Sequence, residues 1–395
     1  MSWPRFILGL NGLQLNQRKM PMIRHLIFCW LVLFPCGGYA GDFFIASYEF
    51  NDRHTATIAS KYDFVITAYT KASAVSKMKT ARPDMKAVYY RNALTLGDKY
   101  YVLDVKTGKR IVHNDWGWYL HDISNSNYCN GLAHAVLSRL NTYPQFDGVL
   151  LDDVKSQLDP SEYHQEGTSK PPTFPPELVK NWQAYMIQLL QAVRAAIGPK
   201  MIILNCGWYA TNYLAHADGQ VDENFSHANW EDPKTYLGTQ SWLNHLNAMK
   251  NAVATSKYYL AQSGVKDGAT QVQIAKLVRY CFCSFLMGVE SNKSFAKHYF
   301  CPSIYYKNYY WYSDWEMKLG DPTGGHFQIP GTSLFRRNFQ KGIVLVNPGA
   351  NTGKFTLEKT YCNLEGQSIS EVMFSDHEGI ILLHCDKERT PMPAK

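Results

Sequence analysis

The most informative stretch of the sequence is an apolar run that ends in two acids, Phe146-Asp147-Gly148-Val149-Leu150-Leu151-Asp152-Asp153-Val154. A continuous apolar run of this length is typical of a parallel strand that is covered on both faces. In a (β/α)8 barrel, active sites lie where the strands end, so Asp152 and Asp153 would stand at the mouth. Only one of them can face the barrel axis directly, because successive side chains on a strand point to opposite sides. The alternative is that one acid caps the loop or pairs with Lys155.

A second pair of acids follows a later apolar segment, Gly219-Gln220-Val221-Asp222-Glu223-Asn224-Phe225. Two carboxylates across a barrel mouth are the minimum equipment for glycoside hydrolysis, one as nucleophile or base and one as proton donor. Glu223 is the better candidate for the donor because it lies further along the motif. A salt bridge at the barrel rim is the alternative for Asp222 and Glu223, and Glu290 is a weaker third candidate.

Polar side chains end the other predicted strands and could bind a substrate rich in hydroxyl groups. Any one of them alone is more often a loop cap than a ligand. The residues are Tyr69, Asn92, Asn205, Gln262 and Ser263.

Tryptophans cluster at the same junctions between strands and loops. Flat aromatic rings stack on the apolar faces of pyranoses and leave the rims of the sugar free for hydrogen bonds. For each single tryptophan, core packing is at least as common a role, so the count of five after strands is the informative observation. The five are Trp116, Trp118, Trp208, Trp230 and Trp242, of which we expect Trp118, Trp208 and Trp230 to bind substrate.

The elements that must position these residues alternate between β-rich runs and helical segments from residue 43 onward. The predicted strands are Phe43–Tyr48, Phe64–Tyr69, Lys86–Asn92, Gly148–Val154, Met201–Cys206, Gln220–Phe225, Tyr258–Gln262 and Ser294–Tyr299. The predicted helices are Asn130–Leu140, Glu177–Ile197, Gln240–Thr255 and Thr270–Met287. Eight strands with helices between them predict a (β/α)8 barrel. A doubly wound open sheet is the alternative, but no glycine-rich phosphate turn follows the first strand.

The pattern of predicted elements changes after about Gly320. Short strands without helices, among them Gly342–Asn347, Ile369–Met373 and Gly379–Leu383, predict a small antiparallel β domain. We therefore expect a barrel over residues 41–320 and a C-terminal β-sandwich-like domain over residues 321–395. The proline-rich patch Lys170–Pro176 falls in the loop after the fourth strand and would form a wall of the cleft.

The first forty residues read as a signal peptide. Arg24 and His25 precede the apolar run Leu26–Pro35, and Gly38-Tyr39-Ala40 supplies small residues for cleavage. The apolar run is too short to span a bilayer. We therefore expect cleavage after Ala40, a periplasmic or secreted protein, and no stable membrane insertion afterwards. The alternatives are a retained N-terminal anchor and, less favoured, a lipoprotein attached at Cys36.

Composition and charge exclude several classes of protein. Apolar residues make up 46% of the 395 residues and charged residues 18%, so a large core can be buried and wholesale disorder is excluded. Residues 1–40 hold four basic residues and no acid, which lowers the formal charge of +7 to +3 for the remaining chain. No basic run is interleaved with aromatics, so we expect no nucleic-acid partner.

Cysteine spacing gives one structural expectation. Seven of the nine cysteines follow the predicted signal peptide, and Cys362 and Cys385 lie in one β segment and could pair. No spacing of cysteine and histidine resembles a zinc site, so we expect no metal and no cofactor.

The runs Asp147–Val154, Asp222–Asn224 and Phe335–Pro348 together resemble bacterial glycoside hydrolases of the group called hypothetical glycosyl hydrolase family 15. That group is similar to endo-α-1,4-polygalactosaminidases and, more distantly, to α-galactosidase and α-amylase barrels. The resemblance covers most of residues 43–385. It implies that Asp152 is the strand-four nucleophile and Glu223 the acid/base. Asp153 stands where relatives often have Asn, which leaves the choice between the two neighbours open.

The sequence therefore predicts an exported hydrolase that cleaves O-glycosidic bonds of a polysaccharide or oligosaccharide, with retention through a glycosyl-enzyme at Asp152. Asn205 and Tyr89 are the candidate hydrogen-bond donors to this nucleophile, and Trp230 would supply apolar surroundings for Glu223. Two rivals remain: a carbohydrate-binding pseudoenzyme of the cell envelope, and an interaction protein whose barrel mouth is merely polar.

Overall fold

The computed structural model describes residues 46–48, 52–228, 232–290, 295–302 and 310–385. Its main element is one eight-stranded sheet in which every neighbouring pair of strands is parallel. The first and last strands of this sheet contact each other, so it curves round into a nearly closed barrel. In spatial order the strands are β1 (Ala46–Tyr48), β2 (Phe64–Thr67), β3 (Lys86–Asn92), β5 (Gly148–Asp152), β7 (Met201–Asn205), β8 (Gly219–Asp222), β9 (Tyr258–Gly264) and β10 (Ala296–Cys301).

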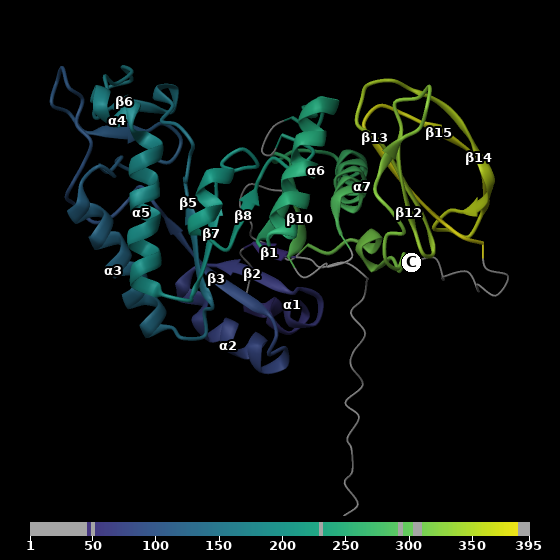
Figure 1. Ribbon diagram of the computed structural model, residues 1–395, viewed down its shortest axis with the longest axis horizontal. Coiled ribbons are helices and arrows are strands. Elements are labelled where there is room, and N and C mark those ends of the chain that lie inside the picture. Colours follow the sequence, from purple (N-terminus) through teal and green to yellow (C-terminus); the bar gives the residue numbers. More distant parts are fainter. Residues whose placement is uncertain (1–45, 49–51, 229–231, 291–294, 303–309, 386–395) are drawn as a thin grey trace, which may run out of the picture. The chain divides into compact units, whose positions relative to one another are not determined.

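Helices connect consecutive strands of the barrel and cover its outside (Figure 1). Helices α3 and α5 pack side by side along one flank. Between β7 and β8 the connection is reduced to a 3-10 helix, η4 (Thr211–His216). The α-helices are α1 (Thr55–Lys61), α2 (Ala72–Ala81), α3 (Ser126–Thr142), α4 (Pro176–Lys180), α5 (Trp182–Ile197), α6 (Thr239–Ala254) and α7 (Gln271–Gly288).

The loops after β3 and β5 fold together above the barrel. They contribute β4 (Ile111–His113) and β6 (Tyr163–Gln165), which pair antiparallel. The 3-10 helix η3 (Pro160–Glu162) precedes β6. The proline-rich segment Lys170–Pro176 connects β6 to α4.

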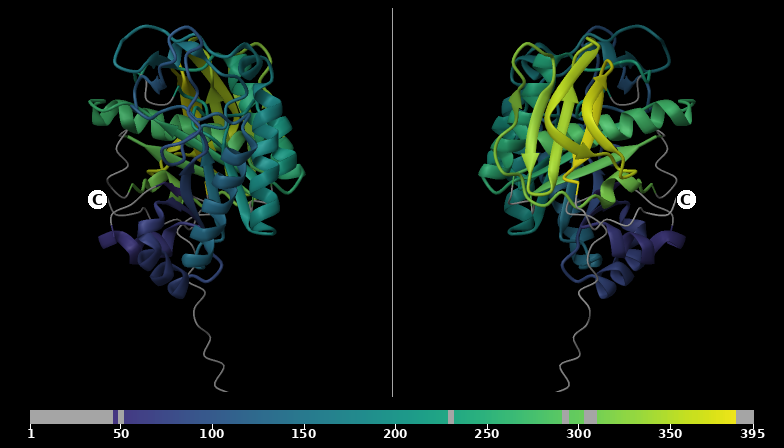
Figure 2. Two further views of the ribbon diagram at one scale, coloured as in Figure 1. Left: turned by 90° about the vertical axis from the view of Figure 1, so that its left-hand side faces the viewer. Right: turned by 90° about the vertical axis from the view of Figure 1, so that its right-hand side faces the viewer.

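The C-terminal part is a six-stranded sheet with only antiparallel pairs, seen face-on in the right-hand view of Figure 2. A short 3-10 helix, η5 (Ser313–Glu316), precedes it. In spatial order its strands are β11 (Phe327–Gln328), β12 (Phe335–Phe339), β13 (Gly342–Asn347), β16 (Glu378–Leu383), β14 (Gly353–Cys362) and β15 (Ser368–Phe374). The predicted fold class, a (β/α)8 barrel with a small C-terminal antiparallel β domain, is confirmed.

Alternation along the C-terminal strands divides their side chains between two cores. On β13, Val344 and Val346 join the core that surrounds α7, whereas Ile343 and Leu345 face a separate core shared with β14 and β15. Cys362 and Cys385, which the sequence allowed to pair, form a disulfide that ties the end of β14 to the chain after β16.

Several predicted boundaries were wrong, for local reasons. The single helix predicted over Glu177–Ile197 is interrupted at Asn181, whose side-chain amide bonds the Glu177 carbonyl at 3.1 Å. The strand predicted to reach Phe225 ends at Asp222. The short helices α1 and α2, and the pair of strands β4 and β6, were not predicted at all.

Candidate active site

The interior of the barrel is filled by an apolar layer from seven of its strands. Its buried members are Phe64, Ile66, Val88, Leu150, Ile203, Val221, Leu260, Tyr299 and Cys301. Side chains two positions further along a strand face the same side. That rule brings polar residues to the mouth from five strands, namely Asn92, Asp152, Asn205, Glu223 and Gln262.

Asp152 ends β5 directly above Leu150 and is held by three hydrogen-bond donors. The Tyr90 hydroxyl donates to Oδ2 at 2.6 Å, and the Asn205 amide donates to Oδ1 at 2.7 Å. The backbone N–H of Asp153 also donates to Oδ1, at 2.8 Å. Donors of this kind stabilise the ionised form of a carboxylate and fix its orientation. The arrangement suits a nucleophile.

Asp153 turns away from the strand direction because its backbone adopts a φ of 58°. Aspartate is one of the few residues other than glycine that tolerate this region. Its carboxylate accepts a hydrogen bond of 2.5 Å from the Asn92 amide and lies 3.8 Å from Nζ of Lys155. Burial and then the nearby Asp152 raise its pKa to about 7. Both aspartates therefore reach the mouth, in different surroundings.

Glu223 follows the last residue of β8 and is half-buried. Loss of hydration, and then the charge of Asp152, raise its pKa to about 8. Hydrogen bonds from Asn205 and Gln262 offset part of this shift, and the Gln262 amide lies 3.4 Å from Oε1. Glu223 thus holds its proton at neutral pH, as a general acid must.

Asp222 points in the opposite direction, into the layer between the sheet and the helices. Its buried carboxylate accepts hydrogen bonds from Nδ1 of His245 on α6 and from the hydroxyl of Tyr259 on β9. The Trp208 ring packs against His245 at 5.5 Å between centroids. Asp222 therefore anchors the end of β8 while its neighbour Glu223 reaches the mouth.

The expectation that Tyr89 donates to the nucleophile was wrong by one residue. Tyr89 faces the helices, where its hydroxyl approaches the Val136 carbonyl at 3.4 Å. Tyr90 occupies the inward position instead, and burial followed by the charge of Asp152 raises its pKa well above its usual value. The alternation of β3 could have identified Tyr90, since Val88 and Asn92 flank it at spacings of two.

The structure places the residues predicted to bind substrate in different surroundings. Asn92, Asn205 and Gln262 contact the acids, as described above. Tyr69 stacks on Tyr143 at 5.8 Å and lies under the Arg139 guanidinium, so the structure places it against α3 and the residue after it. Trp230 lies outside the described residues.

The remaining tryptophans differ in exposure. Trp118 is half-buried against His113 and Tyr163 of the small β4–β6 sheet, and Trp208 is half-buried beside His245. Trp116 is 72% exposed, whereas Trp242 is fully buried and bonds Ser284. Trp242 is thus a core residue. Glu290, the weaker third acid, lies 3.8 Å from the guanidinium of Arg337.

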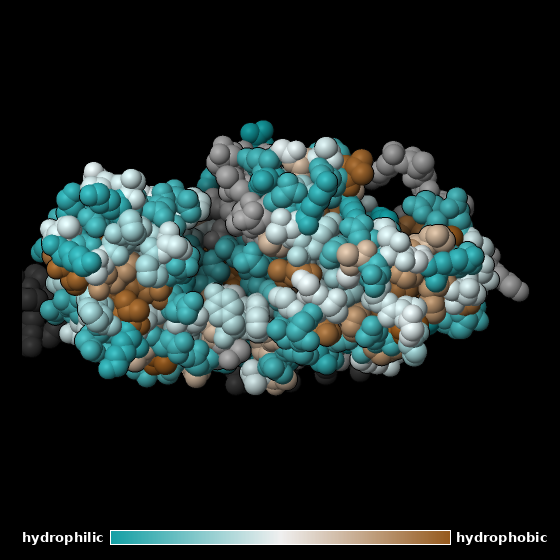
Figure 3. Space-filling model, turned by 90° about the horizontal axis from the view of Figure 1, so that it is seen from above, coloured by the Kyte–Doolittle hydropathy of each residue, from teal (hydrophilic) through white to brown (hydrophobic). Residues whose placement is uncertain are grey.

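The surface seen from above has a hollow over the carboxyl ends of β5, β7 and β8, with hydrophilic residues at its floor (Figure 3). Asp152, Asn205 and Glu223 come from these strand ends. A carboxylate held by hydrogen-bond donors and a second carboxyl group of raised pKa, both at the mouth of one barrel, are the kinds of group that glycosyl transfer to water requires.

Within the described part of the chain, no group of three or more His, Cys, Asp and Glu side chains is arranged to hold a metal ion. None of the described helices is long and apolar enough to cross a membrane.

Comparison with known proteins places this site in context. The family model of hypothetical glycosyl hydrolase family 15 matches residues 59–343, more than half of the chain. No curated protein matches the chain.

Solved structures similar to the chain include three proteins. The glycoside hydrolase domain of PelA from Pseudomonas aeruginosa has 12% identity and a TM-score of 0.44, and the match covers 66% of this chain and 94% of that one. An alpha-amylase from Geobacillus thermoleovorans has 9% identity and a TM-score of 0.43, with 86% of this chain and 97% of that one covered. The noncanonic maltogenic alpha-amylase AmyB from Thermotoga neapolitana has 7% identity and a TM-score of 0.48, with 86% of this chain and 98% of that one covered. Likenesses this distant assign no substrate and no residue role to this chain.

Proposed function

Since the chain belongs to hypothetical glycosyl hydrolase family 15, we propose that it cleaves O-glycosidic bonds of a polysaccharide or oligosaccharide with Asp152 as nucleophile and Glu223 as acid/base. Membership of this family makes the chain a glycoside hydrolase. The observation that carries the assignment of the two residues is their place at the barrel mouth, where Asp152 and Glu223 stand two positions after Leu150 and Val221 of the interior apolar layer.

The environments of the two acids separate their roles. Asp152 accepts three hydrogen bonds that fix its orientation, whereas burial and the charge of Asp152 raise the pKa of Glu223 to about 8. One ionised and one protonated carboxyl group at neutral pH is the division of labour that glycosidases need. Asp153 has a raised pKa as well, but its contacts run to Asn92 and Lys155, at the side of the site.

We propose that the reaction retains the configuration at the anomeric carbon, through a glycosyl-enzyme at Asp152. Retaining glycosidases hold their carboxyl groups about 5–5.5 Å apart, whereas inverting enzymes need about 6.5–9.5 Å to admit a water molecule. The effect of the Asp152 charge on the pKa of Glu223 supports a close approach of the two carboxyl groups.

In the proposed first step, a carboxylate oxygen of Asp152 forms a bond to the anomeric carbon while the bond from that carbon to the leaving oxygen breaks. Glu223 gives its proton to the leaving oxygen. In the second step, the Glu223 carboxylate takes a proton from water, whose oxygen displaces Asp152 and releases the sugar with both acids restored. The Tyr90 and Asn205 donors hold Asp152 in place throughout.

We further propose export, since the basic flank, the apolar run and Gly38-Tyr39-Ala40 together have the pattern of a signal peptide. An exported glycoside hydrolase meets polysaccharides outside the cytoplasm, in the periplasm or beyond the cell. The rival within this proposal is a family member that retains glycan binding in the cell envelope without turnover.

The test is a screen of the purified full chain against a panel of bacterial and plant polysaccharides, with release of reducing ends as the readout. Asp152→Asn serves as the matched control because it keeps the shape of the side chain and removes its charge. The anomeric form of the first product, followed by NMR, distinguishes retention from inversion. Binding to a polysaccharide without any release of reducing ends would favour the pseudoenzyme instead.

A further inference from the structure

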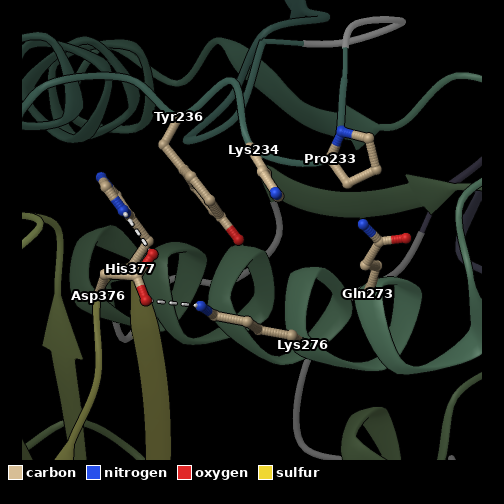
Figure 4. A pocket seen from close by; sticks show the side chains of 7 residues that line it. All are labelled: Pro233, Lys234, Tyr236, Gln273, Lys276, Asp376 and His377. Atoms are coloured by element: carbon tan, nitrogen blue, oxygen red, sulfur yellow. Dashed lines mark hydrogen bonds and ion pairs between the residues drawn. The ribbon is translucent and has the colours of Figure 1, made fainter.

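A pocket of about 340 Å³ lies where the barrel meets the C-terminal sheet, and it uses none of the residues of the acid cluster (Figure 4). Three segments line it. The loop between β8 and α6 contributes Pro233, Lys234 and Tyr236, and α7 contributes Gln273 and Lys276. The turn between β15 and β16 contributes Asp376 and His377. Both parts of the chain are therefore needed to form this pocket.

Contacts among the lining residues hold the walls of the pocket in place. The His377 ring stacks on the Tyr236 ring with centroids 4.0 Å apart and planes 8° apart. Tyr280 packs edge-on against the same Tyr236 ring at 5.4 Å. Nζ of Lys276 lies 3.2 Å from Oδ1 of Asp376, which ties α7 to the C-terminal sheet. Contacts within the fold thus join the three segments that line the pocket.

The polar groups that face the pocket are mostly hydrogen-bond donors. Figure 4 shows the Lys234 ammonium and the Tyr236 hydroxyl directed toward the same space, while the Lys276 ammonium is turned toward Asp376. Gln273 uses its amide oxygen to accept from the backbone N–H and the hydroxyl of Thr270, at 2.8 and 2.9 Å. Its NH2 group is therefore what Gln273 offers to a ligand.

The charges in the pocket do not cancel. Asp376 compensates Lys276, and among the described residues no acid pairs with the side chain of Lys234. Of the described residues that line the pocket, two are lysines and one is an aspartate, so their formal charges sum to one positive charge, beside several neutral donors and the apolar ring of Pro233. A ligand that carries one carboxylate, several hydroxyl oxygens and some C–H surface matches this set of groups.

The size and position of the pocket favour a sugar over a small inorganic ion. A volume of about 340 Å³ is at the lower end of the range for organic ligand sites, about 300–1,000 Å³. The loop that begins at Glu223 reaches the pocket at Pro233, ten residues later. Ten residues span at most about 35 Å, so a polymer bound at the acids could also reach the pocket.

We propose that this pocket binds one acidic, carboxylate-bearing sugar residue of the polysaccharide substrate. This proposal rests on the proposed function in one respect, namely that the sugar residue in the pocket belongs to the polysaccharide that the two acids cleave. The C-terminal domain, through Asp376 and His377, would then help to select the substrate.

The experiment titrates the full chain with galacturonate and with galactose, which differ in whether a carboxylate or a hydroxymethyl group is attached to the ring. We expect galacturonate to bind at least fivefold more tightly, and this preference to shrink as NaCl is raised, because exposed charges are screened. Lys234→Met should abolish the preference and leave galactose binding and the hydrolysis of short substrates unchanged. Lys318→Met, at an exposed lysine outside the pocket, is the matched control and should keep the preference.

Equal affinity for the two sugars, or an unchanged preference in Lys234→Met, would overturn the proposal. So would competition by inorganic phosphate as strong as that by galacturonate, since the pocket would then be a general anion site. The two proposals fail separately. If the protein hydrolyses a polysaccharide but shows no Lys234-dependent preference for galacturonate, only the proposal about the pocket fails. If it shows this preference but hydrolyses no polysaccharide, only the proposed activity fails.

Discussion

The hydroxyl of Tyr90 on β3 donates a hydrogen bond of 2.6 Å to Oδ2 of Asp152 at the end of the neighbouring strand β5. In the register of the two strands, Tyr90 is paired with Leu150, so its side chain extends along the barrel interior toward the mouth. Asn205 holds the other carboxylate oxygen from β7 at 2.7 Å. Asp152 is thus fixed from both flanking strands.

Tyr90→Phe tests whether this contact contributes to catalysis. A hydrogen bond to a charged group contributes about 1.5–3 kcal/mol, so kcat should fall by roughly 10- to 100-fold with KM little changed. Tyr89→Phe is the matched control, because the Tyr89 hydroxyl faces the Val136 carbonyl on the other side of the sheet. Steady-state kinetics of both variants measure this difference in kcat. An equal loss of kcat in the two variants would mean that Tyr90 acts only through packing.

The assignment of the catalytic pair is tested by three isosteric substitutions. Asp152→Asn should reduce turnover to background, and Glu223→Gln should reduce it by about 100- to 10,000-fold, the range typical of a general acid. Asp153→Asn should retain most of the activity, since asparagine also tolerates the positive φ at this position. Circular dichroism and glycan binding check that each variant is folded. Loss of turnover in Asp153→Asn with retention in Asp152→Asn would move the nucleophile by one residue.

The raised pKa of Glu223 predicts the alkaline side of the pH–rate profile. The acid must be protonated to donate, so the rate of glycosidic cleavage should fall as pH rises through about 8. An aryl glycoside whose leaving group needs no proton should not show this decline in its first step. Comparison of the two substrates from pH 5 to 10 checks the prediction, and an identical alkaline decline for both would contradict the role of Glu223.

Much of the site could be predicted because it depends on strand alternation. Asp152, Asn205 and Gln262 each stand two positions after an inward apolar residue, and the sequence alone allows this count. The same count, applied to β3, identifies Tyr90 and excludes Tyr89. Residue type does not distinguish the two neighbours, since both are tyrosines, and only the register of β3 does so.

Other features depend on contacts between distant segments, for which the sequence carries no local signal. The pairing of β4 with β6 joins two loops that are separated by the whole of α3 and β5. Tyr69 was predicted to end the second strand, but β2 ends at Thr67 and Tyr69 begins a 3-10 helix. Its ring stacks on Tyr143 and lies under Arg139, which the sequence places more than sixty residues later. The pocket beside α7 needs Asp376 and His377, which lie over a hundred residues after Tyr236.

Export is tested at the N-terminus of the protein recovered from its native host. Removal of the predicted signal peptide after Ala40 should leave Gly41 as the first residue. N-terminal sequencing of the periplasmic and secreted fractions checks this expectation. Recovery of the uncleaved chain from the cytoplasm would contradict it.

Two neighbouring arginines on β12 provide a matched test of how the barrel and the C-terminal sheet are held together. Arg337 is buried, and its guanidinium donates to the carbonyls of Leu286, Met287 and Val289 at the end of α7. Arg336 faces the other side and pairs with the half-exposed Glu358 at 2.6 Å. Loss of the buried guanidinium should cost about 3 kcal/mol, since four carbonyls, the three at the end of α7 and that of Gly324, lose their donor. Loss of the outer pair should cost about 1 kcal/mol or less. Arg337→Met should therefore lower the melting temperature clearly more than Arg336→Met. Equal shifts would show that α7 and β12 are held by apolar packing, with no measurable contribution from the guanidinium.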